Sequence, residues 1–367
     1  MTEKERLLKV LKGKTPDRVP WFADLGHWYR SQSGEQWNLF GIDNRNKEVT
    51  ALHREVKAGW YIEAGSMHEE YYEDGVTRER EIQGDCAIER FITPLGDIHM
   101  IRKWNPVSFS WDIEKLMIEN INDLKILHYA IARKKFRPKY ENWKSIEEMG
   151  GDIGLGFQSL GYTGLGSLMS YYMGVMNTIY AIYDEPDLIG NYIVDYNKKH
   201  LELVDIYCKS PAPHMIFGDN LSSNVQPPKI FHKYCFQHYK NIADKFHGAG
   251  KTVSSHLDGM LGDIIGVVAD TGVDVADACT PSPTGDLTPM QIREQAGADL
   301  ILMGGISPAM WLPETSEIDF IKHVRQWLDL RKINSRLIQS AGDQVPPGTE
   351  LKRIKLVYNI VEEYGRY

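Results

Sequence analysis

The sequence has few cysteines, and none of them belongs to a pairing motif. The four, Cys86, Cys208, Cys235 and Cys279, are scattered over 367 residues without a C-x-x-C pair. This spacing argues against a disulfide framework and favours a reducing compartment. Residues 1–6 are mostly charged or polar and do not resemble the apolar core of a signal peptide. We therefore expect a cytoplasmic protein.

Long hydrophobic runs and an excess of positive charge are also missing. No stretch approaches the roughly 20 apolar residues that a membrane span needs. The formal net charge is -8, with 42 Lys and Arg against 50 Asp and Glu, so we expect no basic stripe for a phosphate backbone. Gly304-Gly305 does not fit the G-x-G-x-x-G fingerprint of dinucleotide sites. These absences argue against membranes, nucleic acids and NAD as binding partners.

What the sequence does contain is an alternation of short apolar runs with longer segments of helical periodicity. This alternation is typical of βαβ units with parallel strands. The expected strands are Val19–Ala23, Trp60–Glu63, Ile153–Leu160, Met215–Gly218, Thr252–His256, Val273–Ala278, Leu300–Gly304 and Leu337–Ser340. The expected helices cover residues 3–11, 185–209, 228–249, 259–271, 288–297, 316–332 and 349–364. Eight such strands predict a single (β/α)₈ TIM barrel domain over residues 1–367, with an N-terminal helix.

A different pattern interrupts the barrel near residues 71–104. Polar and apolar residues alternate in Thr77–Gln83 and again in Cys86–Thr93, with Gly84-Asp85 between them. This pattern predicts antiparallel β-hairpins inserted after the second strand, as a cover over the barrel mouth. Residues 105–150 carry enough helical pattern to be an excursion of the barrel rather than a linker between domains.

Polar residues follow several of the predicted strands. They are Asp24, His27, Asp219, Asn220, His256, Asp258, Asp277, Cys279 and Asp343. In (β/α)₈ barrels the catalytic groups lie on the loops after the strands, so we expect these side chains to meet at one mouth. His256 and Asp258 are two residues apart and can face the same side, and Asp277 ends the next strand.

This combination of side chains predicts a zinc site. Imidazole, carboxylate and thiolate all bind Zn²⁺, and a catalytic zinc takes three protein ligands and one open position. His256 and Asp277 could be joined by Asp258, Cys279 or Asp343. Alternatively, the histidine only hydrogen-bonds a carboxylate, and the carboxylates cap the following helices. Cys279 is the reserve ligand, since a free cysteine is more often a small buried hydrophobe.

Aromatic residues near the predicted mouth could sandwich a flat ring, although they could also be plain core. They are Trp21, Phe22, Trp28, Tyr29, Phe157 and Tyr162. The candidate catalytic residues are His256, Asp258, Asp219 and Asp343. The candidate substrate-binding residues are Asp24, His27, Tyr162, Asn220 and Trp21. The candidate metal ligands are His256, Asp277 and Cys279.

Four segments resemble the uroporphyrinogen decarboxylase superfamily. They are Lys12 to Pro20, Phe217-Gly218-Asp219-Asn220, His256-Leu257-Asp258-Gly259, and Asp343 to Pro347 with the ending Gly365-Arg366-Tyr367. The resemblance runs over nearly the whole chain and implies a (β/α)₈ barrel. The superfamily includes porphyrinogen decarboxylases and zinc-dependent methyltransferases that serve corrinoid proteins.

At the positions that carry these two activities in the superfamily, this chain has different residues. The decarboxylases have arginines after the first strand, which bind the carboxylates of the tetrapyrrole. Here Asp24 and His27 stand in that place, and a carboxylate would repel an acidic substrate. The coenzyme M methyltransferases bind zinc through a His-x-Cys pair and a later cysteine. Here the pair is His256-x-Asp258 and the later position is Asp343.

The segment from His256 to Gly259, followed by Asp277 to Asp286, is most similar to the O-demethylase branch. This resemblance implies a methyltransferase that moves a methyl group from a small methoxylated aromatic to the cob(I)alamin of a separate corrinoid protein. Zinc, held by His256 and Asp277, or a protonated acid would activate the ether oxygen, while Asp219, Asn220 or Tyr162 orients the ring.

Three further questions stay open at this point. The chain could be a decarboxylase that acts on a different small acid, which would need no metal. It could also be a barrel that binds a ligand without turnover. A homodimer is a further alternative that the sequence does not decide.

Overall fold

Eight parallel strands form the centre of the computed structural model, which describes residues 1–41 and 47–367. In sheet order they are β1 (Phe22–Ala23), β2 (Gly59–Glu63), β9 (Gly154–Gly161), β10 (His214–Leu221), β11 (Thr252–Leu257), β12 (Val275–Cys279), β13 (Ile301–Gly304) and β14 (Leu337–Gln339). Trp21, next to β1, pairs in parallel with Gln339 of β14. The sheet therefore closes on itself, and the predicted (β/α)₈ barrel is confirmed.

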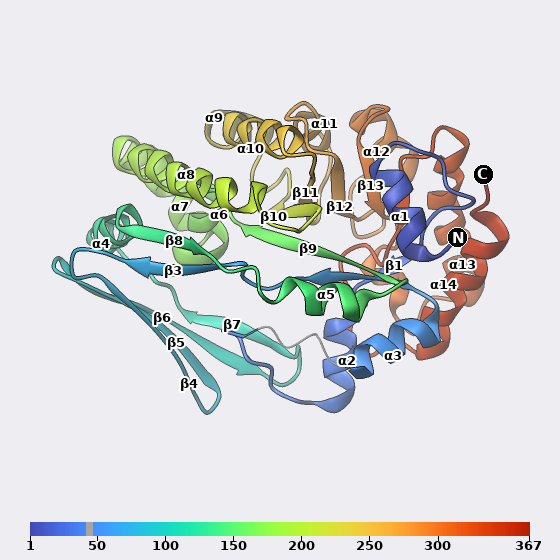
Figure 1. Ribbon diagram of the computed structural model, residues 1–367, viewed down its shortest axis with the longest axis horizontal. Helices are drawn as coiled ribbons and strands as arrows, with labels where there is room; N and C mark the ends of the chain where they lie inside the picture. Colours follow the sequence, from blue (N-terminus) through green and yellow to red (C-terminus); the bar gives the residue numbers. More distant parts are fainter. Residues whose placement is uncertain (42–46) are drawn as a thin grey trace.

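Helices surround this barrel (Figure 1). They are α1 (Glu3–Leu11), α2 (Gly26–Ser33), α3 (Lys47–Val56), α5 (Trp143–Gly150), α6 (Gly164–Ser167), α7 (Val175–Asp184), α8 (Pro186–Cys208), α9 (Pro228–Tyr234), α10 (Phe236–Gly248), α11 (Ile264–Ala269), α12 (Pro289–Ala296), α13 (Glu317–Leu328) and α14 (Leu351–Tyr364). Thr2 and Thr288 accept hydrogen bonds from the backbone of Glu5 and Gln291, and these capping boxes fix where α1 and α12 begin. The helix expected over 228–249 is two helices, because the chain breaks at Cys235.

Helix α1 covers one end of the barrel. Its Leu7 and Val10 are buried against Leu155, Val275 and Ile301, which lie at the starts of their strands. These apolar side chains fill the amino-terminal end of the barrel interior. The carboxyl ends of the strands are therefore left as the mouth.

The insertion lies between β2 and β9 and is longer than the expected 71–104. It holds β3 (His68–Tyr72), β4 (Thr77–Gln83), β5 (Cys86–Thr93), β6 (Gly96–Asn105), β7 (Ser110–Lys115), α4 (Ile121–Ala132) and β8 (Lys134–Pro138). The predicted hairpin of β4 and β5 is confirmed, and β6 and β7 extend it to a four-stranded antiparallel sheet. A second small sheet pairs β3 with β8. In Figure 1 the insertion lies on one side of the barrel, next to α7 and α8.

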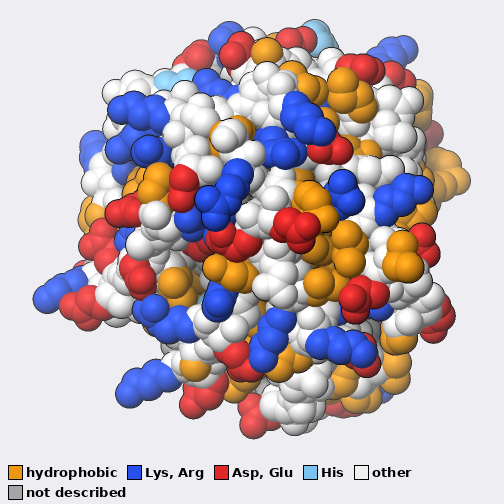
Figure 2. Space-filling view, turned by 90° about the vertical axis from the view of Figure 1, so that its right-hand side faces the viewer, with side chains coloured by type: hydrophobic (Ala, Val, Ile, Leu, Met, Phe, Trp, Pro, Cys, Tyr) orange, Lys and Arg blue, Asp and Glu red, His pale blue; other side chains and the backbone are white. Residues whose placement is uncertain are grey.

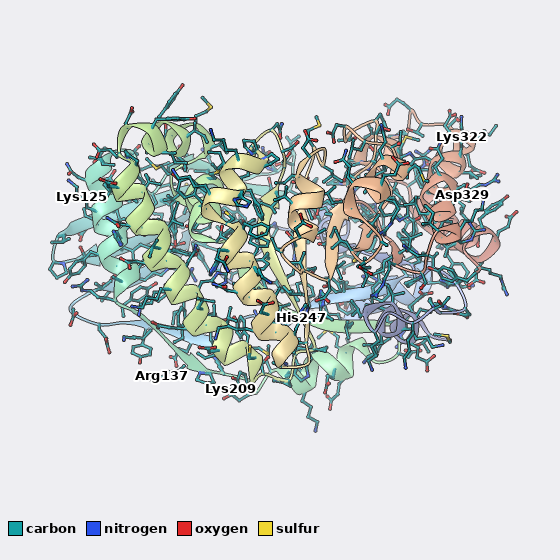
Figure 3. All side chains as sticks on the ribbon, turned by 90° about the horizontal axis from the view of Figure 1, so that it is seen from above. Lys125, Arg137, Lys209, His247, Lys322 and Asp329 are labelled. Atoms are coloured by element: carbon teal, nitrogen blue, oxygen red, sulfur yellow. The ribbon has the colours of Figure 1, made fainter. Side chains whose placement is uncertain are left out.

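The outer surface mixes charges of both signs. On the face that carries the two termini, α13 and α14, blue and red side chains are interspersed (Figure 2). Seen from above in Figure 3, α8 and α10 run side by side, with Lys209 and His247 near their carboxyl ends. Among the helices of residues 1–41 and 47–367, none is both long and apolar enough to cross a membrane.

Candidate active site at the barrel mouth

His256 lies near the carboxyl end of β11 and is the centre of a charged cluster. The register of β11 and β12 places His256 directly beside Asp277. The His256 Nδ1 atom is 3.0 Å from Asp277 Oδ2, and its Nε2 atom is 3.7 Å from Asp343 Oδ1. One ring nitrogen is thus held by a neighbouring carboxylate, while the other faces Asp343.

The charge of His256 is set by competing effects. Burial alone would lower its pKa, but the hydrogen bond and charge of Asp277 outweigh burial, and the charges of Asp343 and Asp258 add to them. Together they raise the pKa of His256 to about 9. The imidazole is therefore protonated at neutral pH, and both ring nitrogens carry hydrogen.

Four carboxylates lie near His256. Burial raises the pKa of Asp343 to about 6; the charge of His256 lowers it, while nearby Asp24, Asp258 and Asp277 raise it further. Asp24 is exposed, and its Oδ1 accepts a 2.9 Å hydrogen bond from the Gly26 backbone. Asp258 follows β11 directly and is exposed. These four carboxylates therefore lie near His256, and Arg30 of α2 acts on the charge of Asp24.

The floor of the site contains residues that the sequence gave no reason to select. Tyr61 of β2 stacks on Phe157 of β9, with ring centroids 4.2 Å apart. His214 Nε2 is 2.9 Å from the hydroxyl of Ser254, which lies two residues before His256 on the same face of β11. Burial lowers the pKa of His214 to about 4, so this second histidine is neutral at neutral pH. In the sequence, only the two-residue spacing of Ser254 and His256 indicated that this face of β11 belongs to the site.

Asp219, a candidate catalytic residue, is not brought to His256. It is fully buried, and it accepts hydrogen bonds from the Thr163 backbone at 2.7 Å and from the Tyr239 hydroxyl at 2.9 Å. Two residues earlier, Phe217 stacks on Tyr239 in the layer of outer helices, with centroids 3.9 Å apart. Asp219 shares that outward face because side chains alternate along a strand. Its neighbour Asn220 is exposed and has a φ of 49°.

Three other candidates lie in the core or at a side of the mouth. Trp21 has no exposed surface and packs in the outer core where the barrel closes. Cys279 is also fully buried, and its thiol donates to the Ala276 carbonyl at 3.4 Å. His27 lies 2.7 Å, through Nε2, from the Ser108 carbonyl, and so joins α2 to the insertion. A fourth candidate, Tyr162, follows β9 and lines a cavity of about 380 Å³ together with Glu63 of β2 and Ser159 of β9.

The predicted zinc ligands His256, Asp277 and Cys279 do not form a ligand set. Nδ1 of His256 is occupied by Asp277, and Cys279 is turned into the core. Over residues 1–41 and 47–367, no three His, Cys, Asp or Glu side chains are arranged to hold a metal ion. In this arrangement Nε2 is the ring nitrogen of His256 left for a metal ion, with Asp277 as the hydrogen-bond partner of Nδ1. Zinc stays a prediction, which elemental analysis of the wild-type protein and of His256→Ala would test.

A closed (β/α)₈ barrel with charged side chains at the carboxyl ends of its strands has the layout of a barrel enzyme. Residues 160–364 match the family model described as uroporphyrinogen decarboxylase (URO-D). The chain belongs to the uroporphyrinogen decarboxylase family. A comparison with curated protein sequences finds no match.

Two solved structures are similar to the chain to different degrees. A methyltransferase from Methanosarcina mazei is 15% identical, with 99% of each chain covered and a TM-score of 0.62. A glycoside hydrolase family 5 mannosidase from Rhizomucor miehei is 10% identical, with 95% of this chain and 94% of that chain covered and a TM-score of 0.43. The first likeness supports the fold over the full length of the chain, and the second is too distant to carry an argument.

Proposed function

We propose that the chain is a corrinoid-dependent methyltransferase. It would remove the methyl group of a methoxylated aromatic compound and transfer it to the cob(I)alamin of a separate corrinoid protein. Membership of the family and the full-length fold shared with a methyltransferase support this class of reaction. The observation that carries the proposal is the 3.0 Å contact by which Asp277 holds His256 at the mouth, where the surrounding carboxylates raise the pKa of the imidazole to about 9.

Ether demethylation needs a charge or proton on the leaving oxygen. The corrinoid partner would supply the nucleophile that bonds to the methyl carbon. As the methyl–oxygen bond breaks, its electron pair stays on the oxygen, and His256 Nε2 donates a proton there, so that a phenol leaves. Asp277 accepts the hydrogen bond from Nδ1 and so keeps Nε2 directed to the mouth.

The charge around His256 favours this reaction over decarboxylation of a small acid. Asp24, Asp258, Asp277 and Asp343 all act on the charge of this centre. They would repel a carboxylate substrate, whereas a neutral aryl ether has no such cost. The decarboxylase alternative therefore has less support from the site.

The test is methyl transfer from a panel of methoxyarenes to a reduced corrinoid protein, followed by phenol release and by the absorbance of the corrinoid. We expect His256→Ala to lower the rate about 10²- to 10⁴-fold, the usual contribution of a general acid. A matched control is His247→Ala, because His247 also faces an aspartate, Asp274, at 3.0 Å, but lies at the end of α10. That variant should transfer at the wild-type rate.

Other outcomes would overturn the proposal. If no methoxyarene reacts with a competent partner, and small acids release CO₂ instead, the decarboxylase alternative is correct. If ligands bind with equal affinity to wild type and His256→Ala, and nothing turns over, the chain is a binding barrel.

A further inference from the structure

Arg102 of β6 is half-buried and has no partner for its charge. Other buried arginines are held: Arg18 and Arg78 contact carboxylates, and Arg293 donates to backbone carbonyls. The Nε atom of Arg102 is buried and makes no hydrogen bond, and its guanidinium forms no ion pair within residues 1–41 and 47–367. Withdrawing a cation from water without a counter-ion is costly, which indicates a missing anion.

The inner face of the insertion sheet carries this arginine. Side chains alternate along β6, so Arg102 shares a face with Ile98 and Met100, which are 4% and 1% exposed. The guanidinium carbon of Arg102 lies 4.6 Å from the centroid of the Tyr171 ring. Tyr171 belongs to the π-helical turn Leu168–Tyr172, which follows β9 and α6. Arg102 is therefore turned from the insertion toward the barrel.

The acid on the same face does not neutralise Arg102. The register of the sheet puts Arg78 and Arg80 of β4 and Glu89 of β5 on this face. Glu89 accepts hydrogen bonds from Arg78 at 2.7 Å and from the Tyr171 hydroxyl at 2.6 Å, and it lies 3.7 Å from Arg80. Glu89 is thus already held by other groups, and Arg102 is left as the cation without a counter-ion.

Tyr162 connects this arginine to the barrel mouth. Tyr162 directly follows β9 at its carboxyl end, and its ring centroid is 6.4 Å from that of Tyr171. Burial raises the pKa of Tyr162, and the charge of Arg102 partly offsets this, so the guanidinium is within electrostatic reach of the phenol. Both tyrosines line the cavity of about 380 Å³ that opens at the ends of β2 and β9.

The two sides of the mouth therefore differ in charge. Four carboxylates lie near His256, whereas Arg102 is an uncompensated cation on the side of the insertion. An acid group on a ligand would be repelled from the first side and attracted to the second. This difference can orient a ligand that has an acid group at one end.

The chemistry of Arg102 and its neighbours selects the ligand. A guanidinium presents parallel N–H groups that match a carboxylate, and the rings of Tyr162 and Tyr171 suit an aromatic ring. The cavity beside them has the size of a site for a ligand with one ring. We propose that Arg102 binds a carboxylate on the aromatic substrate, so that the substrate is a methoxylated aromatic acid whose ether oxygen points to His256. The inference rests on the proposed methyl transfer for the ether end alone.

The experiment compares two probes of nearly the same shape, 4-fluorobenzoate and the neutral 4-fluorobenzamide, by ¹⁹F NMR titration of the whole chain at pH 7. We expect the wild-type protein to bind the benzoate about 10-fold or more tightly, the effect of a charge-assisted contact. Arg102→Gln should bind both probes equally. The matched control is Arg90→Gln, because Arg90 is exposed on the opposite face of the same sheet, and it should keep the wild-type preference.

Each other outcome of the titration contradicts the site. Equal binding of the two probes by the wild-type protein would show that no cation of the mouth selects the acid. A preference that survives in Arg102→Gln would place the carboxylate elsewhere, and a preference lost equally in Arg90→Gln would reduce it to the general charge of the sheet. If Arg102→Gln does not fold, Arg102→Lys keeps the charge without the fork and should weaken the preference severalfold, so an unchanged preference would be decisive against a bidentate contact.

Methyl transfer separates this inference from the proposed function. With 4-methoxybenzoate as methyl donor, Arg102→Gln should raise KM about 10-fold with little change in kcat, whereas His256→Ala should lower kcat. If the benzoate is preferred but no methoxyarene reacts, the proposed function fails and the carboxylate site stands. If methoxyarenes react but benzoate and benzamide bind equally, this inference alone is wrong.

Discussion

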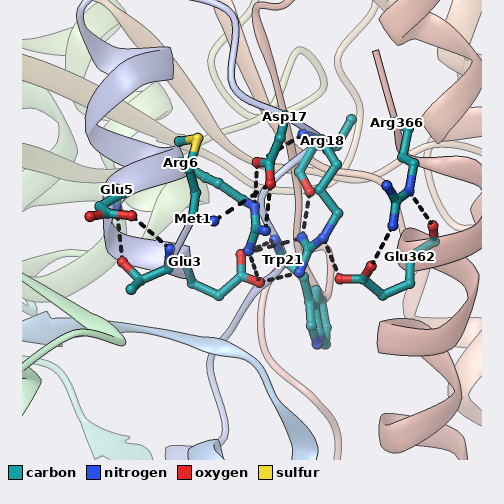
Figure 4. Close-up of polar contacts among 11 residues, drawn as sticks. Met1, Glu3, Glu5, Arg6, Asp17, Arg18, Trp21, Glu362 and Arg366 are labelled. Atoms are coloured by element: carbon teal, nitrogen blue, oxygen red, sulfur yellow. Dashed lines mark hydrogen bonds and ion pairs between the residues drawn. The ribbon is translucent and has the colours of Figure 1, made fainter.

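The two ends of the barrel each hold a cluster of charged side chains, and the clusters differ in balance. At the amino-terminal end, acids and bases are paired with one another (Figure 4). Its members are Glu3, Arg6, Asp17, Arg18 and Glu362. At the carboxyl end, four carboxylates lie around His256, and Arg30 of α2 acts on the charge of one of them, Asp24. Pairing is typical of a structural cluster, whereas the carboxylates at the mouth raise the pKa of His256 to about 9 and burial raises that of Asp343 to about 6, and perturbed pKa values are typical of functional sites.

The amino-terminal cluster joins three elements. Arg18 is 2% exposed and contacts Glu3 of α1, and its Nε donates to Glu362 of α14 at 2.7 Å. Glu3 also accepts a 3.1 Å hydrogen bond from the backbone of Trp21, at the entrance to β1. The network therefore fixes α1 and α14 to the strand at which the barrel closes.

The largest expected effect on stability comes from breaking this network with Arg18→Met. The change leaves the buried Glu3 with less compensation and removes a partner of the half-buried Glu362. Removing one partner of a buried ion pair typically costs about 3 to 5 kcal/mol of the free energy of unfolding. Urea denaturation measures it. The rate of transfer per folded molecule should not change.

Arg54→Ala is the control for this prediction, because Arg54 pairs with Asp152 at 3.0 Å on the surface, with side chains 52% and 58% exposed. Its loss should cost less than about 1 kcal/mol. If the two variants were equally stable, the paired cluster would not have the structural role assigned to it.

A smaller effect is expected from Asp277→Asn at the other end. The variant loses the hydrogen bond and charge that keep the pKa of His256 at about 9. We expect this pKa to fall toward its ordinary value of 6.5, as measured by NMR titration of the imidazole, and the rate at pH 8 to fall about 10-fold or more.

The pH dependence of stability gives the same test an independent readout. A histidine with a raised pKa in the folded state contributes stability that is fully present below pH 6.5 and is lost as the pH rises through about 9. Wild type should thus lose stability between pH 7 and pH 10, and Asp277→Asn should lose less. Asp195→Asn removes the carboxylate 2.8 Å from His128 and should leave the His256 titration unaltered. An unchanged titration in Asp277→Asn would contradict the proposed role of the pair.

The same comparison shows what could be predicted from the sequence. The apolar runs located the barrel strands, and strand order alone placed Asp277 beside His256. The sequence could not show that Asp219 faces away from His256, because a polar residue at a strand end can face outward as readily as inward. Tyr61 and His214 lie within strands and carry no local signal. The pairing of β3 with β8 spans the whole insertion, so no short pattern in the sequence could reveal it.

The smallest effect, and one of opposite sign, is expected from Asp343→Asn. Burial raises the pKa of Asp343 from 3.8 to about 6. A carboxyl group with a raised pKa favours folding below pH 3.8, and this contribution is lost as the pH rises through about 6, so the ionised Asp343 costs stability at neutral pH. Asparagine removes that cost. The melting temperature should therefore rise at pH 7 and change little at pH 4. The dependence of the transfer rate on pH below neutrality should also become weaker. Asp258→Asn, at an exposed carboxylate of the same mouth, should keep the wild-type difference between the two pH values. A melting temperature that falls at pH 7 in Asp343→Asn would show that the mouth is held together by its carboxylates, like the paired cluster at the opposite end.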